Sequence, residues 1–193
     1  MKRRDALKNI GLSAGLIVAT PSVISLLNSC NTDPNNWRPI FLNKEQAKVL
    51  MDIVDVIIPK TLWRYWPNDT PSANEVNVVE FLDKYYKEIL DDNRQKWLKE
   101  TYVSLLNLIK SNYSDTINDL TEDNYKDLLD NHMILNGESN DISELLKNIK
   151  SDTIWAYKIS EFVGENVLAY DPIPGVAYCG DLEELTGGKS WSL

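Results

Sequence analysis

The sequence is poor in the residues that most metal sites and nucleophilic active sites require. Its 193 residues include one histidine, His132, and two cysteines, Cys30 and Cys179, which form neither a CxxC pair nor a CxxCH haem-attachment motif. A site with several histidines is therefore excluded, and the cysteine spacing matches no zinc motif. A Ser-His-Asp or Cys-His site would have to use His132. We interpret this residue as structural, since it lies near the expected end of a helix, where a cation is favoured.

Nucleotide-binding motifs are also missing. The sequence contains no GxGxxG after a strand and no GxxxxGK[ST], and Gly187-Gly188-Lys189-Ser190 lacks the preceding glycine of a phosphate-binding loop. Carboxylates are abundant, but they fall on expected polar helix faces and turns, where solvation and helix capping explain them. Those considered are Asp91, Asp92, Asp115, Asp119, Glu122, Asp123, Asp127 and Asp130. We therefore predict no catalytic, cofactor-binding or metal-binding residue in this chain.

The charge is divided unevenly along the chain. The net charge is −9, and residues 1–29 contribute +3, which leaves −12 for the remainder. Phosphate backbones bind to clustered lysine and arginine, so an acidic body of this kind argues against a nucleic-acid partner. It equally disfavours adsorption of the body to anionic lipid.

Residues 1–29 have the organisation of an export signal. A basic start containing Arg3 and Arg4 precedes an uncharged, largely apolar stretch from Gly11 to Leu27. The arginine pair followed by Leu7 and Lys8 resembles a twin-arginine signal, which exports proteins already folded. Ala6 stands where that motif usually has phenylalanine, so an ordinary secretory signal remains the alternative. Either route predicts the periplasmic side of a bacterial membrane.

The signal ends in Leu27-Asn28-Ser29-Cys30, which resembles a lipobox. In that interpretation Cys30 becomes the acylated N-terminus of the mature protein, and several acyl chains hold it stably on a membrane. The alternative is a retained transmembrane anchor, for which the apolar run is short. We expect residues 30–40 to form a tether and residues 41–193 to form the folded domain.

The mature domain has helical periodicity throughout. Asn43 and Gln46 form the pattern of a capping box, and the following helix is expected to end at Pro59. Further helix starts are predicted at Asn77, Asp91, Thr121, Asn140 and Ser160. The second helix is expected to bury Val78, Phe81, Leu82, Tyr85, Ile89 and Leu90. The predicted fold class is all-α, a compact bundle of about five to six helices with an irregular C-terminal tail containing proline and glycine.

Two aromatic segments are candidate interfaces. Trp63, Tyr65 and Trp66 lie in a proline-containing loop, where exposed aromatics suit either a protein interface or sugar stacking. The alternative is that they cover the core. The tail from Ala169 is expected to be extended or turned, and to pack on its own domain or on a partner. Its candidate interface residues are Tyr170, Pro172, Pro174 and Tyr178.

Several segments in a fixed order resemble the gluconate 2-dehydrogenase subunit 3 family. They are the arginine pair with Leu7-Lys8-Asn9-Ile10-Gly11, Trp37 to Leu42, Gln46-Ala47, Asp55 to Thr61, Val78 to Asp83, Tyr157 to Glu161, Val167 to Gly175, and Tyr178-Cys179. The most specific are Ile57-Ile58-Pro59-Lys60-Thr61 and Asp171-Pro172-Ile173-Pro174-Gly175. The similarity spans nearly the whole chain, but the tryptophan-rich stretch Leu62 to Thr70 departs from the family pattern.

The resemblance implies a non-catalytic role beside a larger enzyme. It implies a separate catalytic subunit of the glucose–methanol–choline type that carries FAD, in some complexes with a cytochrome c subunit that carries haem. The small subunit would escort the folded flavoprotein through the membrane, stabilise it and tether it. The substrate would be gluconate, another sugar acid, a sugar or a glycoside. Two other classes remain open: a stand-alone carbohydrate-binding surface lipoprotein that uses Trp63, Tyr65 and Trp66, and an independent enzyme.

Overall fold

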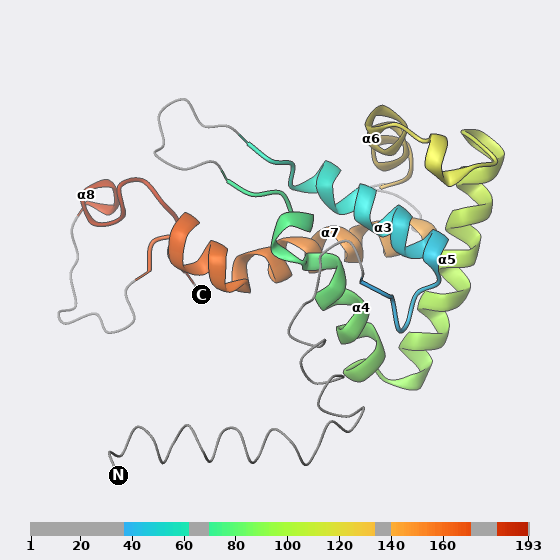
Figure 1. Ribbon diagram of the computed structural model, residues 1–193, viewed down its shortest axis with the longest axis horizontal. Helices are drawn as coiled ribbons and strands as arrows, with labels where there is room; N and C mark the ends of the chain where they lie inside the picture. Colours follow the sequence, from blue (N-terminus) through green and yellow to red (C-terminus); the bar gives the residue numbers. More distant parts are fainter. Residues whose placement is uncertain (1–36, 62–69, 134–139, 171–180, 193) are drawn as a thin grey trace, which may run out of the picture. The chain divides into compact units, whose positions relative to one another are not determined.

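The computed structural model describes residues 37–61, 70–133, 140–170 and 181–192 (Figure 1). The chain divides into two units, Met1–Arg38 and Pro39–Leu193. Of the first unit only Trp37 and Arg38 are described. The predicted signal peptide, with Arg3, Arg4 and Cys30, lies outside the described residues, and its boundaries stay predictions.

The second unit is built from helices, as predicted. The α-helices are α3 (Lys44–Ile57), α4 (Val78–Glu88), α5 (Asp92–Asn112), α6 (Glu122–His132), α7 (Asp141–Ile159) and α8 (Leu182–Thr186). Short 3-10 helices, η2 (Asn74–Val76) and η3 (Ile117–Asp119), and a π-helical turn, η4 (Val163–Val167), join them. Within the described ranges, extended pairing is limited to the bridges Thr61–Thr70 and Ala169–Trp191. No described helix is long and apolar enough to span a bilayer.

Helix α7 is the central element of the core. It packs against α3, α4, α5 and α6, and η4 follows it. Its Leu145, Leu146 and Ile149 are completely buried, as are Leu50 and Ile53 of α3. Each fully buried aliphatic side chain of this size contributes about 1.5–3 kcal/mol relative to exposure. The core is therefore built around α7 together with α3, which also packs against α4 and α6.

Most predicted helix starts are confirmed by their capping contacts. The Asn43 side chain accepts from the amide of Gln46, whose side chain accepts from the amide of Asn43, so the capping box is complete. Asp91 and Asn140 also accept from amides of the first turns of α5 and α7. Thr121 forms a second complete capping box at the start of α6. Local sequence chemistry therefore sets these helix starts.

Two predicted helix starts are correct in position, but their side chains do not form the expected cap. Asn77 precedes α4, but it has a left-handed backbone (φ 59°) and its side chain makes no capping hydrogen bond. It instead ends η2 and turns the chain into α4, a conformation that asparagine tolerates better than most residues. Ser160 donates its hydroxyl hydrogen bond backward to the carbonyl of Tyr157 at 2.8 Å. Ser160 ends α7, and its carbonyl accepts from the amide of Gly164 at 2.8 Å where the next helical segment begins. That segment runs from residue 161 to Val167 as predicted, with a π-helical turn at Val163–Val167.

Helix α4 buries a face that agrees with the predicted one only at Val78 and Leu82. Phe81, Tyr85 and Ile89 were expected inside, but Phe81 and Ile89 are exposed and Tyr85 is half-buried. The buried residues of α4 are Val78, Val79, Leu82, Asp83 and Tyr86. Apolar residues cover so much of the circumference of α4 that periodicity alone does not select one side. The choice is made by α3 and α7, the helices against which α4 packs.

The described part of the tail is more ordered than predicted. Leu182–Thr186 forms α8, whose N-cap Asp181 accepts a hydrogen bond from the amide of Glu183. The end of the chain pairs with residues after η4, because Ala169 donates to the carbonyl of Ser190 and accepts from the amide of Ser192. A larger residue at Gly164 of η4 would require the Ser192 side chain to move slightly, since a Cβ there would lie 3.2 Å from the Ser192 hydroxyl. This part of the tail therefore packs on its own domain.

Candidate partner interface

Three aromatic side chains from α4 and α7 form a cluster at the surface. The ring centroids of Phe81 and Trp155 lie 5.3 Å apart, and those of Tyr85 and Trp155 lie 5.4 Å apart. Phe81 and Tyr85 are stacked at 6.4 Å. These are favourable distances for aromatic pairs. Phe81 and Trp155 nevertheless each keep 39 % of their surface exposed. We call Phe81, Tyr85 and Trp155 the aromatic trio.

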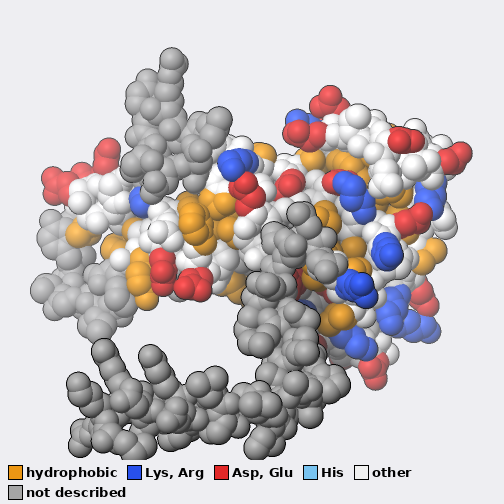
Figure 2. Space-filling model, viewed as in Figure 1, with side chains coloured by type: hydrophobic (Ala, Val, Ile, Leu, Met, Phe, Trp, Pro, Cys, Tyr) orange, Lys and Arg blue, Asp and Glu red, His pale blue; other side chains and the backbone are white. Residues whose placement is uncertain are grey.

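More exposed apolar residues come from the same two helices. Ile89 follows Tyr85 by one turn of α4, and Ile159 follows Trp155 by one turn of α7. Ile154 and Phe162 are also exposed. Figure 2 shows hydrophobic side chains gathered over the C-terminal end of α7 and η4, while acidic side chains cover α6 and α8. A concentration of large apolar residues on one pair of helices is typical of an interaction surface.

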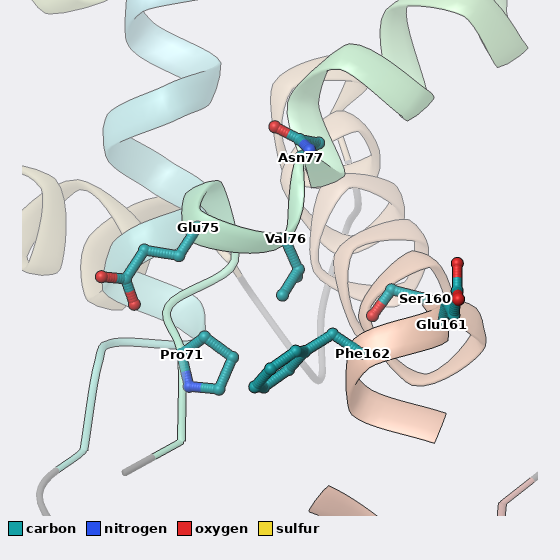
Figure 3. Close-up of a pocket in the computed structure, with 7 residues that line it drawn as sticks. All are labelled: Pro71, Glu75, Val76, Asn77, Ser160, Glu161 and Phe162. Atoms are coloured by element: carbon teal, nitrogen blue, oxygen red, sulfur yellow. The ribbon is translucent and has the colours of Figure 1, made fainter. Parts of the chain in front are cut away.

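A pocket of about 400 Å³ lies where α4 begins and α7 ends (Figure 3). The side chains of Pro71, Val76 and Phe162 converge on it. Asn77 and Ser160 complete its wall, with Glu75 and Glu161 at its edges. Phe81 follows Asn77 by one turn, and Trp155 precedes Ser160 by five residues, so the aromatic trio lies farther along the same two helices.

Partly buried hydrogen bonds hold the two helices and the pocket wall in place. Tyr86 of α4 donates to the carboxylate of Asp152 on α7 at 3.3 Å. Tyr157 of α7 donates to the carbonyl of Pro71 at 2.8 Å. Asn74 is fixed to α3, because its backbone amide donates to Asp55 and its side chain donates to the carbonyl of Met51. An interface supported in this way loses less conformational entropy on binding.

The titratable groups beneath the trio are shifted by burial. Burial raises the pKa of the Tyr86 hydroxyl well above its usual value, and Tyr102 and Asp152 raise it further. Burial also raises the pKa of Asp152, against the opposing effects of the Tyr86 hydrogen bond and the Arg94 charge. Both groups lie between helices rather than in the pocket, so we interpret these shifts as consequences of packing.

The described residues contain no group of three histidine, cysteine, aspartate or glutamate side chains that could hold a metal ion. His132 is the last residue of α6 and is half-buried, which agrees with its interpretation as a helix-end residue. The site can therefore supply apolar and aromatic contacts with polar groups around them. This is the composition of a protein docking surface.

Comparison with known families supplies the deciding observation. The family model described as gluconate 2-dehydrogenase subunit 3 matches residues 44–175. The chain belongs to the gluconate 2-dehydrogenase subunit 3 family. The match covers α3 to α7 and both helices of the aromatic trio. No curated protein and no solved structure matches the chain.

The interface residues predicted for this subunit 3 family member fall mostly outside the described structure. Six of these residues are not described and stay predictions: Trp63, Tyr65, Trp66, Pro172, Pro174 and Tyr178. Tyr170 is described and is 55 % exposed, next to Ala169, which pairs with Trp191. Nothing in the described residues brings Tyr170 together with the aromatic trio.

The trio itself was missed by sequence reasoning. Phe81 and Tyr85 were assigned to the core, and Trp155 was included only as an extension of α7. Asp83 is the relevant residue, but a carboxylate beside an apolar stripe is either exposed or paired with buried donors, and the sequence does not choose between the two. The structure shows the second case, which places Phe81 and Tyr85 outward.

Proposed function

We propose that this subunit 3 family member is a non-catalytic accessory subunit that binds a periplasmic FAD-dependent dehydrogenase of the glucose–methanol–choline type through the α4–α7 surface. The observation that carries the proposal is the aromatic trio, which stays exposed on two helices that are bonded to each other by Tyr86 and Asp152. Aromatic residues in a supported, central position provide much of the binding energy at protein interfaces.

The family supports the presence of a dehydrogenase partner. It is described as a subunit of gluconate 2-dehydrogenase, and such a subunit acts within a complex. In our proposal FAD belongs to the partner, and haem c belongs to a cytochrome subunit where one is present. The substrate is gluconate or a related sugar, sugar acid or glycoside, and it reacts on the catalytic subunit.

The predicted signal extends the role to escort and tethering. FAD is inserted in the cytoplasm, so the catalytic subunit must cross the membrane folded. A twin-arginine signal on a bound subunit, with Arg3 and Arg4, provides that route. Acylated Cys30 then holds the complex on the periplasmic face of a membrane.

Export of the two proteins together tests the proposal. The tagged chain is coexpressed with its dehydrogenase, and periplasmic and cytoplasmic fractions are assayed for flavin absorbance and for dye-linked sugar-acid oxidation. We expect both proteins in the periplasm with the native signal, and both in the cytoplasm after Arg3→Lys with Arg4→Lys. Normal export of the flavoprotein with the altered signal would refute the escort role. A chain that captures no flavoprotein but retains oligosaccharides would instead support the carbohydrate-binding alternative.

A further inference from the structure

The outward surface of α7 is positively charged between Leu145 and Ile159, although the first turn of α7 carries the exposed Asp141 and Glu144 and the domain as a whole is acidic. Lys150 is exposed, and Lys147 and Lys158 are half-buried. Lys147 and Lys158 are eleven residues apart, about three helical turns, so they lie on one line along the helix. Among the described residues, no ion pair joins any of the three lysines to a carboxylate.

The same stretch of α7 offers little negative charge. Between Leu145 and Ile159 the one acidic residue is Asp152, which is half-buried and accepts the hydrogen bond of Tyr86. The chain beyond residue 29 nevertheless carries −12, and acidic side chains cover α6 and α8 in Figure 2. The positive surface is therefore local to α7.

The charged residues of α4, on the other side of the aromatic trio, largely cancel one another. On α4, Lys84 is paired with Glu80 at 2.7 Å. Lys87 and Glu88 are both exposed and have opposite charges. Charge therefore changes across the trio, from near zero on the α4 side to positive on the α7 side.

Resting on the proposed function, we infer that the dehydrogenase presents acidic side chains to Lys147, Lys150 and Lys158, beside an apolar area that covers the aromatic trio. The apolar contact supplies most of the affinity, since charges at the edge of an interface contribute little to it. The lysines accelerate encounter and fix the orientation, because edge charges act mainly on the association rate and on the choice of partner.

Two other occupants fit the observations less well. An anionic membrane would be repelled by the exposed Glu88 beside the trio and by the acidic body. A second copy of the chain would present the same surface. A symmetric contact would therefore place the lysines of both α7 helices close together, where they would repel each other. A protein surface can confine its acidic side chains to the area opposite the three lysines, away from Glu88, which an extended anionic bilayer cannot do.

Association kinetics test the inference. The mature chain is immobilised, and the probe is the FAD-containing dehydrogenase that copurifies with the wild type, produced separately. Lys150→Glu is compared with Lys44→Glu, which makes the same change in charge at an exposed position of α3. We expect Lys150→Glu to lower the association rate constant by about threefold to tenfold at low ionic strength. The difference between the association rate constants of wild type and Lys150→Glu should become smaller toward 0.5 M salt, because the Debye length shortens to about 4 Å. Lys44→Glu should leave the rate nearly unchanged.

The outcomes separate this inference from the proposed function. If the wild type binds the flavoprotein and the two variants bind with equal rates, the inference fails and the proposed function stands. If the wild type binds no flavoprotein, both fail.

Vesicles of phosphatidylcholine and phosphatidylglycerol provide a further arm. Loss of vesicle binding in Lys150→Glu, with dehydrogenase binding intact, would assign the lysines to the membrane and overturn the inference. A dimer of the chain that Lys150→Glu alters, with dehydrogenase binding unchanged, would overturn it as well.

Discussion

The carboxylate of Asp83 accepts a hydrogen bond from the backbone amide of Leu42 at 2.9 Å. The same carboxylate accepts from the amides of Phe41 at 3.1 Å and Ile40 at 2.6 Å. Asp83 is completely buried in α4, so three backbone donors replace the water that its charge would otherwise bind. One residue of α4 thus fixes the segment that enters α3, and it also determines which face of α4 turns outward.

Asp83→Asn should destabilise the domain. The amide nitrogen of asparagine would point at one of the three backbone donors and leave it unpaired, which costs about 1–3 kcal/mol. Urea unfolding followed by circular dichroism measures the loss. Asp115→Asn, at an exposed position, is the control and should change stability by less than about 0.5 kcal/mol. Equal effects of the two substitutions would contradict the assigned role of Asp83.

The left-handed backbone of Asn77 gives a second prediction. Asn77→Gly should leave stability unchanged or raise it, because glycine adopts φ 59° without steric cost. Asn77→Val should cost about 1–2 kcal/mol, because a β-branched residue is strained in this region. Thermal unfolding of the two variants provides the comparison. If valine were tolerated as well as glycine, the turn between η2 and α4 would not have this conformation.

The aromatic trio should matter for binding much more than for folding. Trp155→Ala is expected to weaken dehydrogenase binding by about 2 kcal/mol or more, roughly thirtyfold, as for other central interface aromatics. Because Trp155 is 39 % exposed, we expect Trp155→Ala to lower the free energy of unfolding by less than it weakens the binding free energy. The affinity is measured by titration calorimetry with the purified dehydrogenase.

Val103 provides the matched control for Trp155. It is an exposed apolar residue of α5, with 51 % of its surface accessible, and it belongs to neither helix of the trio. Val103→Ala should leave the affinity unchanged. Similar losses in Trp155→Ala and Val103→Ala would argue against the α4–α7 surface as the binding site.

Asp152 should make stability fall with rising pH. Burial raises its folded pKa above the ordinary value of 3.8, so the folded protein keeps a proton that the unfolded chain has already released. Between these two pKa values the folded state binds more protons, and the free energy of unfolding decreases as pH rises. Asparagine at this position cannot ionise, and its carbonyl can still accept from Tyr86.

Denaturant titrations at a series of pH values test this role of Asp152. The stability of Asp152→Asn relative to the wild type should increase with pH from about 3.8 upward and then level off. Glu88→Gln, an exposed change on α4, is the control and should show a much weaker trend. Parallel pH curves for wild type and Asp152→Asn would refute the account.

The proposed acylation gives a prediction about location. Cys30→Ser should move the chain and the dehydrogenase activity from the membrane fraction to the soluble periplasmic fraction. Cys179→Ser, the only other cysteine change available, should leave both on the membrane. A Cys30→Ser protein that stays on the membrane would favour the retained transmembrane anchor. Fractionation with an activity assay measures the distribution.

Sequence reasoning located the helices well where the signals are local. The Asn43–Gln46 pair completes its capping box, and Pro59 follows Ile58, the C-cap residue of α3. Tyr125, Leu128 and Leu129 of α6 are buried at helical spacing, because α6 carries one narrow apolar stripe. Interactions within a few residues of each other fix these features, so they can be read without the fold.

The sequence by itself therefore determined the all-α class, most helix starts and the family resemblance, since each depends on contacts or motifs that are close along the chain. Only the tertiary structure decided that Asp83 and Tyr86 face inward while Phe81 and Tyr85 face outward. That choice depends on Ile40, Phe41, Leu42 and Asp152, which lie more than forty residues from their partners in α4. A helix with apolar residues on most of its sides can bury either face, and the positions of its distant neighbours select one.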